Sequence, residues 1–349
     1  MKRYRSRVLT VAGVVLGMMV AACGGGGGKK ATPGGSPTPT RKFVYVSPNA
    51  IGVNQFLQLG KVGIERAGKQ FGATTDVFES DDPTARQPNV EAAIREGATI
   101  VVMLGFEFND IVTDLAPKNT NVQFLIVDQC IDKPPPNVHC VVFREYEATY
   151  LAGIEAGLLT KTNKIGAIGA LDIPFLHRYT DPFFEGAKSA NPNITKTTTL
   201  WVGGDNPFAD PARSKEQALT MAAQGADQVM AATAGGNGGI FEAAKDKGFF
   251  TYGVDVNQCP QAPGFVVDNV IKQTDVAVVG GVKSVLKGGD QILVLGLAEG
   301  GIGLTSLTPD AGSSQCLAVQ HADVLDKVRQ AKQDIIDGKI KIKDPLTGA

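Results

Sequence analysis

Short apolar stretches rich in β-branched residues alternate with amphipathic stretches from Phe43 onward. Strands of this kind, each followed by a helical period, are typical of β-α units that build a parallel sheet. In the first half of the chain the pattern predicts strands at 43–48, 74–80, 99–104, 122–128 and 138–143, and helices at 54–72, 87–97 and 108–119.

The second half repeats this alternation. It predicts strands at 164–171, 196–202, 227–233 and 249–255, and helices at 181–191, 211–225 and 239–248. An amphipathic segment at 322–340 predicts a closing helix on this half. Roughly 310 residues are more than one core usually organises, so we expect an α/β fold of two lobes.

One internal repeat maps the two halves onto each other. The segments from Gly97 to Asp128 and from Gly225 to Asp255 both run Gly-Ala, strand, loop, helix, strand and Val-Asp. Ligands of open α/β sheets bind at the carboxyl ends of the strands, so Asp128 and Asp255 are predicted to face one cleft. A helix N-cap or an Asx-turn is the alternative role for either side chain.

Other loops carry weaker signals. Gly235 and Gly236 lie between a strand and a helix without dinucleotide or P-loop spacing, so we expect a tight turn that lets backbone approach a neutral ligand. Phe106 and Phe108 follow a strand and belong either to the core or to a stacking surface. The segment 203–211 has the composition of a surface turn and lacks the spacing of a calcium loop.

No motif of an enzyme or a metal site is present. The three histidines are scattered, without the local context of a hydrolase or a metalloprotease. The four cysteines beyond Cys23 form no CxxC or Cys/His cluster, so no metal and no cofactor are expected. An even number indicates disulfides. Three pairings are possible, and proximity in sequence favours Cys130–Cys140 with Cys259–Cys316.

The N-terminus predicts export. Residues 1–22 combine a basic start with an apolar run that is too short to span a membrane, and small residues precede Cys23. This resembles a lipoprotein signal peptide, with Cys23 as the lipidated residue and 23–41 as a flexible tether rich in Gly, Pro, Ser and Thr. The expected location is the extracytoplasmic face of the cell membrane. An ordinary secretory signal and a single membrane anchor are the alternatives.

The net charge of the chain beyond its leader argues against nucleic acid as a partner. The leader holds four of the 34 basic residues and none of the 35 acidic ones, so the remainder is net acidic with interspersed charges.

Several segments together resemble one known family. They are FREYEATYLAGIEAGLLTKTNKIGAIGALDIP (143–174), DPFFEGAK (181–188), QGADQVMAATAGGNGGIFEAAKDKG (224–248), YGVDVNQ (252–258), VIKQTDVAV (270–278) and LGLAEGGIGL (295–304). In this order they resemble the basic membrane protein family of substrate-binding lipoproteins, whose best-understood members are similar to purine nucleoside receptors of ABC importers.

The resemblance implies a type I periplasmic binding protein fold, with two Rossmann-like lobes joined by a hinge and a ligand held between them. The N-terminal lobe would comprise 42–143 plus 272–290, and the C-terminal lobe 144–271 plus 291–349. It also implies a monomer without enzymatic activity, which delivers a small molecule to an ABC permease.

Site residues follow from the same resemblance. Asp255 and Lys272 match positions that hold ribose hydroxyls, and Asp128 matches one that contacts the edge of the base. Gly235 and Gly236 match the loop that approaches the ligand. Two aromatic residues are implied to contact the ligand, namely Phe106 and Phe183.

The first loop departs from the family pattern. Asn54 is retained, but Val53 stands where the family has Phe, and no Asp lies upstream. Phe56 is the candidate substitute for the missing aromatic. This departure leaves two alternatives open, a sugar or other small polar ligand, and a lipoprotein that senses a ligand without feeding an importer.

Overall fold

The structure is a computed structural model in which residues 41–348 are described. These residues lie in one compact unit. The predicted leader, the predicted lipidation site Cys23 and the predicted tether lie outside the described residues, except that Arg41 begins the first strand. Among residues 41–348, no helix is long and apolar enough to cross a membrane.

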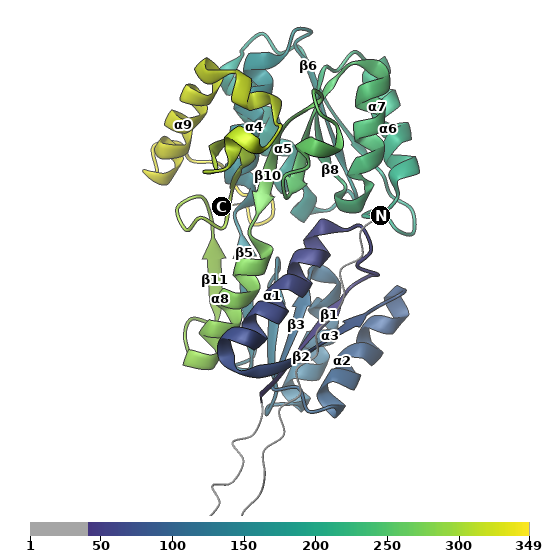
Figure 1. Ribbon diagram of the computed structural model, residues 1–349, viewed down its shortest axis with the longest axis vertical. Helices are drawn as coiled ribbons and strands as arrows, with labels where there is room; N and C mark the ends of the chain where they lie inside the picture. Colours follow the sequence, from purple (N-terminus) through teal and green to yellow (C-terminus); the bar gives the residue numbers. More distant parts are fainter. Residues whose placement is uncertain (1–40, 349) are drawn as a thin grey trace, which may run out of the picture. The chain divides into compact units, whose positions relative to one another are not determined.

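The first sheet is fully parallel (Figure 1). Its strands lie in the order β11 (Ile292–Leu295), β5 (Val138–Phe143), β4 (Gln123–Val127), β3 (Ile100–Leu104), β1 (Arg41–Ser47) and β2 (Ala73–Glu79). Four helices pack on it: α1 (Gln55–Phe71), α2 (Arg86–Arg95), α3 (Asn109–Leu115) and α8 (Thr274–Lys287).

The second sheet repeats this topology. Its order is β12 (Ile302–Leu304), β10 (Val266–Lys272), β9 (Phe250–Asp255), β8 (Gln228–Ala232), β6 (Lys164–Gly169) and β7 (Lys196–Trp201). Only β12 among these strands runs antiparallel to its neighbour. The helices of this lobe are α4 (Glu145–Leu159), α5 (Pro174–Ala190), α6 (Pro211–Ala223), α7 (Asn237–Lys247) and α9 (Ala322–Ile336).

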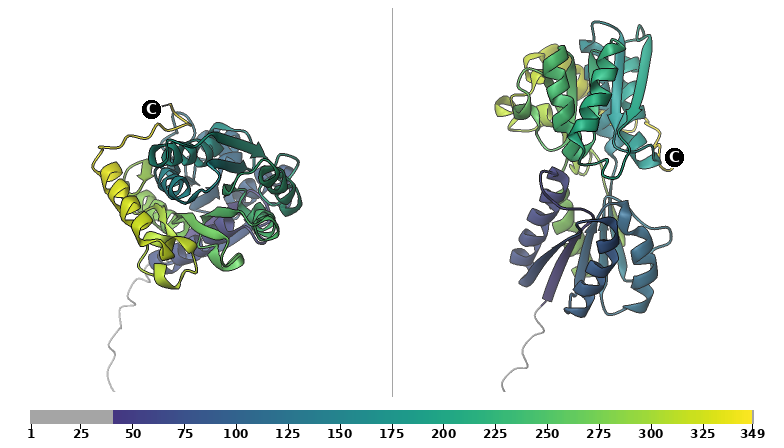
Figure 2. Two further views of the ribbon diagram at one scale, coloured as in Figure 1. Left: turned by 90° about the horizontal axis from the view of Figure 1, so that it is seen from above. Right: turned by 90° about the vertical axis from the view of Figure 1, so that its right-hand side faces the viewer.

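Helices cover both faces of each sheet (Figure 2). In β1, Phe43 and Tyr45 pack toward α1 and α8, whereas Val44 and Val46 pack toward α2 and α3. This is the alternation that a strand imposes on its side chains, and burial on both faces explains why the strands are continuous apolar runs. The predicted α/β architecture of two lobes with parallel sheets is confirmed.

Glycines allow α4 and α5 to pack closely. A Cβ atom on Gly153 would collide with the carbonyl oxygen of Phe183, and one on Gly186 would collide with that of Tyr150. The two backbones therefore approach at distances that no larger residue permits. These contacts hold the C-terminal half of α5, and the N-terminal turns of the same helix border the cavity described below.

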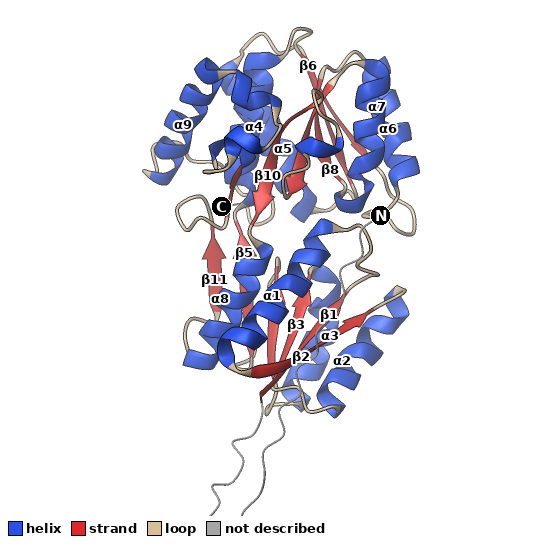
Figure 3. Ribbon diagram, in the orientation of Figure 1, coloured by secondary structure: helices blue, strands red, loops and turns tan. Residues whose placement is uncertain are grey.

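The chain crosses between the sheets after β5, after β10 and after β11 (Figure 3). The predicted boundary at residue 290 is too early, because Ile292 to Leu295 pair with β5 in the first sheet. The helix predicted at 181–191 also begins earlier. Pro174 opens α5 at its first turn, where a missing N–H costs nothing, and Pro182 lies inside the helix.

Residues 41–348 contain two disulfides, Cys130–Cys140 and Cys259–Cys316, the pairing favoured by proximity in sequence. The first joins the segment after β4 to β5, and the second closes a loop of 57 residues in the second lobe.

Candidate ligand-binding site

A cavity lies where the carboxyl ends of both sheets meet. It encloses about 630 Å³ of space between atoms, including some open to solvent. Both lobes contribute side chains from loops that follow β1, β3, β4, β8 and β9. The strand order reverses between β1 and β3 and between β6 and β8, and ligands of such sheets bind beside this reversal.

Asp128 and Asp255 occupy equivalent places in the two lobes. Asp128 directly follows β4 with φ of 87°, and Asp255 ends β9 with φ of 71°. Asp tolerates this left-handed backbone better than most residues, but the conformation still costs about 1 kcal/mol or more. Each side chain is nearly buried, with 5% and 7% exposed, and both line the cavity.

Lys272 holds Asp128 in place. Its Nζ lies 2.6 Å from Asp128 Oδ1 and 3.0 Å from Glu145 Oε1. Burial opposes the positive charge, but the two carboxylates raise the pKa of Lys272 well above its ordinary value. The ring of Phe56 lies 5.2 Å from Nζ, and the ring of Tyr179 lies 5.5 Å from it. Lys272 is therefore a permanent cation with most of its surroundings already satisfied.

A second buried cation continues this cluster behind the cavity. Arg178 donates two hydrogen bonds to the Asp344 carboxylate, at 2.8 and 2.6 Å. It also donates to Glu145 Oε2 at 3.2 Å and to the carbonyl of Phe143 at 3.0 Å. Glu145 thus connects Arg178 with Lys272 at the first crossing between the lobes, and Asp344 attaches the C-terminal segment to it.

Asp255 lacks such a partner. No hydrogen bond or ion pair to its carboxylate is found among residues 41–348. Burial raises the pKa of Asp255 to about 6, with Lys272 acting to lower it and Glu145 to raise it. A nearly buried carboxylate with free acceptor oxygens is poised to receive hydrogen bonds from a ligand.

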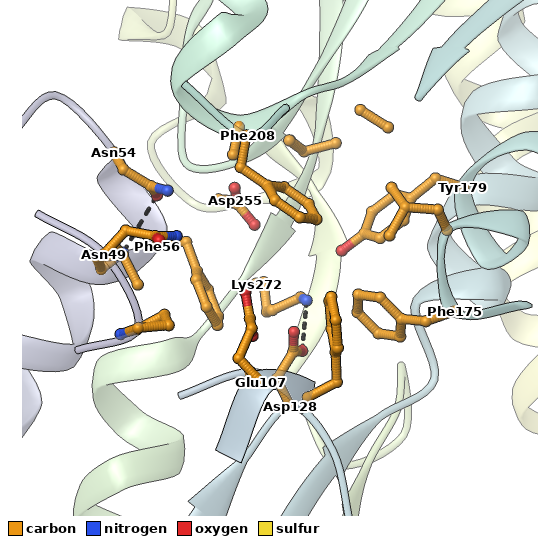
Figure 4. A pocket seen from close by; sticks show the side chains of 18 residues that line it. Asn49, Asn54, Phe56, Glu107, Asp128, Phe175, Tyr179, Phe208, Asp255 and Lys272 are labelled. Carbon is orange, nitrogen blue, oxygen red and sulfur yellow. Dashed lines mark hydrogen bonds and ion pairs between the residues drawn. The ribbon is translucent and has the colours of Figure 1, made fainter. Parts of the chain in front are cut away.

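Aromatic rings form much of the remaining wall (Figure 4). Phe56 and Phe106 come from the first lobe, and Phe175, Tyr179 and Phe208 come from the second. The rings of Phe106 and Phe208 lie 6.4 Å apart between centroids, across the two lobes. Such surfaces suit a flat, weakly polar ring system.

Hydrogen bonds join the lobes beside the cavity. Gln55 Oε1 accepts from Gln258 Nε2 at 2.9 Å and from Gln261 Nε2 at 3.4 Å. Asn54, the preceding residue, lines the cavity and caps α1 by accepting from the backbone N–H of Leu57. The start of α1 is therefore anchored where it meets the second lobe.

Six predicted site residues line this cavity: Asn54, Phe56, Phe106, Asp128, Asp255 and Lys272. Phe183 does not. It is fully buried in the core, with its ring against Tyr252 at 5.2 Å. Gly235 and Gly236 also lie off the cavity wall, and Ala234, with φ of 50°, supplies that loop's contact.

Sequence reasoning missed other lining residues. Phe208 belongs to the segment 203–211, which was expected to be a surface turn. Phe175 and Tyr179 lie in the first turns of α5, ahead of the predicted helix start. Glu107 was missed although the neighbouring Phe106 was predicted. The position of Glu107 shortly after a strand is the sequence signal that could have identified it. Among the described residues, no group of three potential metal ligands is found.

Comparison with known proteins gives a consistent result. Residues 42–345 match the family described as "ABC transporter substrate-binding protein PnrA-like". The chain is 28% identical over 366 residues to the ABC transporter nucleoside-binding protein BmpA of Lactococcus lactis subsp. cremoris, covering 97% of this chain and 99% of that protein. It is 27% identical over 330 residues to an uncharacterized lipoprotein of Pyrococcus abyssi, covering 84% of this chain and 81% of the relative.

A solved structure shares the fold. It is an ABC transporter solute-binding protein from Aeropyrum pernix K1, with a TM-score of 0.76 and 24% identity. The likeness covers 87% of this chain and 94% of that one.

Proposed function

This chain belongs to the family of PnrA-like ABC transporter substrate-binding proteins, and from that premise we propose that it captures a purine nucleoside and delivers it to a membrane permease. As a substrate-binding protein of this family it is not an enzyme. The proposal therefore concerns which ligand it binds, how the ligand is held and where the protein acts.

The unpaired carboxylate of Asp255 is the observation that carries the proposal. A carboxylate accepts hydrogen bonds from two neighbouring hydroxyls, which is what the ribose of a nucleoside offers. Lys272 has three N–H donors, and two carboxylates lie within reach of them. The third donor is available to a ribose hydroxyl.

The other parts of the cavity suit the base. The aromatic rings provide stacking surfaces, and Asp128 Oδ2 remains open because Lys272 binds Oδ1. That open oxygen accepts an N–H of the base in our proposal. The relative from Lactococcus lactis is named as a nucleoside-binding protein, which supports the same assignment.

Lipidation of Cys23 would keep this receptor at the extracytoplasmic face of the membrane, within reach of its permease. The basic, apolar leader and the small residues before Cys23 support this proposal. A relative described as a lipoprotein supports it too. We propose that the protein acts there as a monomer.

Calorimetric titration of the soluble domain tests the proposal. Adenosine, inosine and guanosine should bind, whereas ribose alone should bind weakly or not at all because it leaves the aromatic walls uncovered. Asp255→Ala should cost about 2–5 kcal/mol of nucleoside affinity, since the hydroxyls lose a buried charged acceptor. Asp323→Ala, an exposed acid at the start of α9, is the matched control and should bind as the wild type does.

Two results would count against the proposal. Unchanged nucleoside affinity in folded Asp255→Ala would remove Asp255 from the site. Tight binding of ribose or another sugar, with no nucleoside binding, would replace the ligand class by the sugar alternative. Mass spectrometry of the small molecule that co-purifies with the protein provides an independent measurement.

A further inference from the structure

The carboxylates that line the cavity outnumber the cations that could pair with them. Glu107, Asp128 and Asp255 line it, against Lys272 as the one lining cation among the described residues. Lys272 is already in contact with Asp128 and with Glu145. The ligand must therefore bring donors, and an anionic ligand such as a nucleotide is disfavoured.

Glu107 is the acceptor that no structural role explains. It lies in the short turn Phe106–Phe108 that follows β3, and its carboxylate folds back over Gly105, where a Cβ atom would collide with Oε2. Within residues 41–348 no side chain donates a hydrogen bond to it and no cation pairs with it. Burial raises the pKa of Glu107, with its own backbone N–H and Arg86 acting to lower it. Glu107 is partly exposed in the cavity, so a ligand that covers it removes its water and must supply donors in return.

Glu107 and Asp128 lie on the same side of the cavity. Strands β3 and β4 are paired neighbours, and the two acids follow the carboxyl ends of these strands. Figure 4 shows both carboxylates at the end of the cavity that the first sheet forms. Asp128 offers one open oxygen, because Lys272 binds the other, and Glu107 offers a further acceptor.

We propose that Glu107 is a specificity-determining residue which, together with Asp128, selects a purine base that presents two neighbouring N–H donors. This inference rests on the proposed function. Guanine has that edge, with a ring N–H beside an exocyclic amino group. Hypoxanthine has the ring N–H alone, and adenine places an unprotonated ring nitrogen beside its amino group.

The chemistry gives an order of affinity. Guanine donates a hydrogen bond to each carboxylate. Hypoxanthine displaces the water around Glu107 but donates no hydrogen bond to it. Adenine directs a lone pair toward one of the two acids. Sites built to hydrogen-bond a group reject analogues that lack it because their own polar groups stay unpaired. Guanosine should bind most tightly of the three nucleosides.

Titration of guanosine and inosine into wild type and Glu107→Leu tests the inference. A hydrogen bond to a charged group contributes about 1.5–3 kcal/mol, so wild type should favour guanosine over inosine by about tenfold or more. In Glu107→Leu the ratio should fall to about twofold, through weaker guanosine binding and tighter inosine binding, because inosine then no longer desolvates an unpaired carboxylate. Glu107→Gln keeps the shape and one neutral acceptor and should lie between the two. Glu216→Gln, an exposed acid on α6, is the control for loss of a negative charge.

The outcomes separate this inference from the proposed function. If nucleosides bind but wild type shows no guanosine preference, or both Glu107 variants retain the full preference, Glu107 does not determine specificity and the proposed function stands. If no nucleoside binds to wild type, both fall together.

Discussion

Replacing Arg178 with Met should destabilise the protein strongly. The change keeps a similar volume but removes the cation that Asp344 and Glu145 share, and both acid side chains are less than a tenth exposed. Breaking a buried ion pair from one side costs about 3–5 kcal/mol, because a charge stays behind without compensation.

The remaining contacts place the expected loss near the lower end of that range. Asp344 keeps hydrogen bonds from the backbone N–H of Leu346, at 3.0 Å, and from Thr347, at 3.1 Å. Glu145 keeps Lys272 at 3.0 Å. We therefore expect a loss of about 3 kcal/mol, which is a large part of the stability of a typical domain.

Urea unfolding followed by circular dichroism measures this loss as a shift in midpoint at constant slope. The matched control is Arg329→Met, which removes an ion pair to Asp326 of similar length, 2.8 Å, with side chains that are 55% and 76% exposed. That variant should lose less than about 1 kcal/mol. Adding Asp344→Asn to Arg178→Met should restore part of the stability, since it removes the stranded charge.

Equal effects of the two arginine substitutions would refute this reasoning. Such a result would mean that the buried cluster is solvated in the native state, or that its charges are neutralised at little cost. A destabilising rather than restoring effect of Asp344→Asn in the Arg178→Met background would refute the role given to the stranded carboxylate.

Three further substitutions have expected outcomes. Asp255→Asn should stabilise the ligand-free protein at pH 8 by up to roughly 3 kcal/mol. The pKa of Asp255 is about 6 in the folded protein and lower in the unfolded chain, so protonation stabilises the folded wild type as the pH falls through 6 toward 4. The difference in thermal stability between variant and wild type should therefore vanish near pH 4. Removing the disulfide Cys259–Cys316, which closes a loop of 57 residues, should lower the free energy of unfolding by about 4 kcal/mol in urea. Removing Cys130–Cys140, which closes a loop of 10 residues, should lower it by about 3 kcal/mol. Gly153→Ala should cost about 1–3 kcal/mol through its collision in the α4–α5 contact, whereas Gly280→Ala, with no atom within 4 Å of its Cβ, should gain up to about 1 kcal/mol.

The β-α alternation was sufficient to predict the architecture because both sheets are covered on two faces. Strands such as β3 are fully buried and stand out as apolar runs between turn residues. Helix α4 was not predicted, because its buried residues lie on all sides of the helix and the sequence therefore shows no amphipathic period. The position of β11 depends on pairing between Ile292 and Cys140, and local patterns carry no information about such a distant partner.

Residues that line the cavity could be predicted where the internal repeat or the family resemblance identified them. They could not be predicted where lining the cavity depends on how the two lobes pack against each other. The repeat predicted Asp128 and Asp255 because it places them at matching strand ends, and both line the cavity. Phe183 lies on the same stripe of α5 as Phe175 and Tyr179, but about 12 Å further along the axis than Phe175 and about 6 Å further than Tyr179, beyond the end that borders the cavity. No periodicity distinguishes these three positions.

The two aspartates differ in a way that links ligand binding to closure. Lys272 forms an ion pair with Asp128, whereas Asp255 has no ion-pair or hydrogen-bond partner among the described residues and interacts with Lys272 only at longer range. Bringing the lobes together without a ligand therefore desolvates Asp255 at a cost. Contacts beside the cavity, such as the hydrogen bond between Gln55 and Gln258 and the ring contact between Phe106 and Phe208, contribute about 1 kcal/mol each in return. A ligand whose hydroxyls bind Asp255 offsets that cost and favours the closed arrangement. In our proposal the unpaired carboxylate thus acts against closure around an empty cavity, and the same feature that lowers the stability of the ligand-free protein makes closure depend on the ligand.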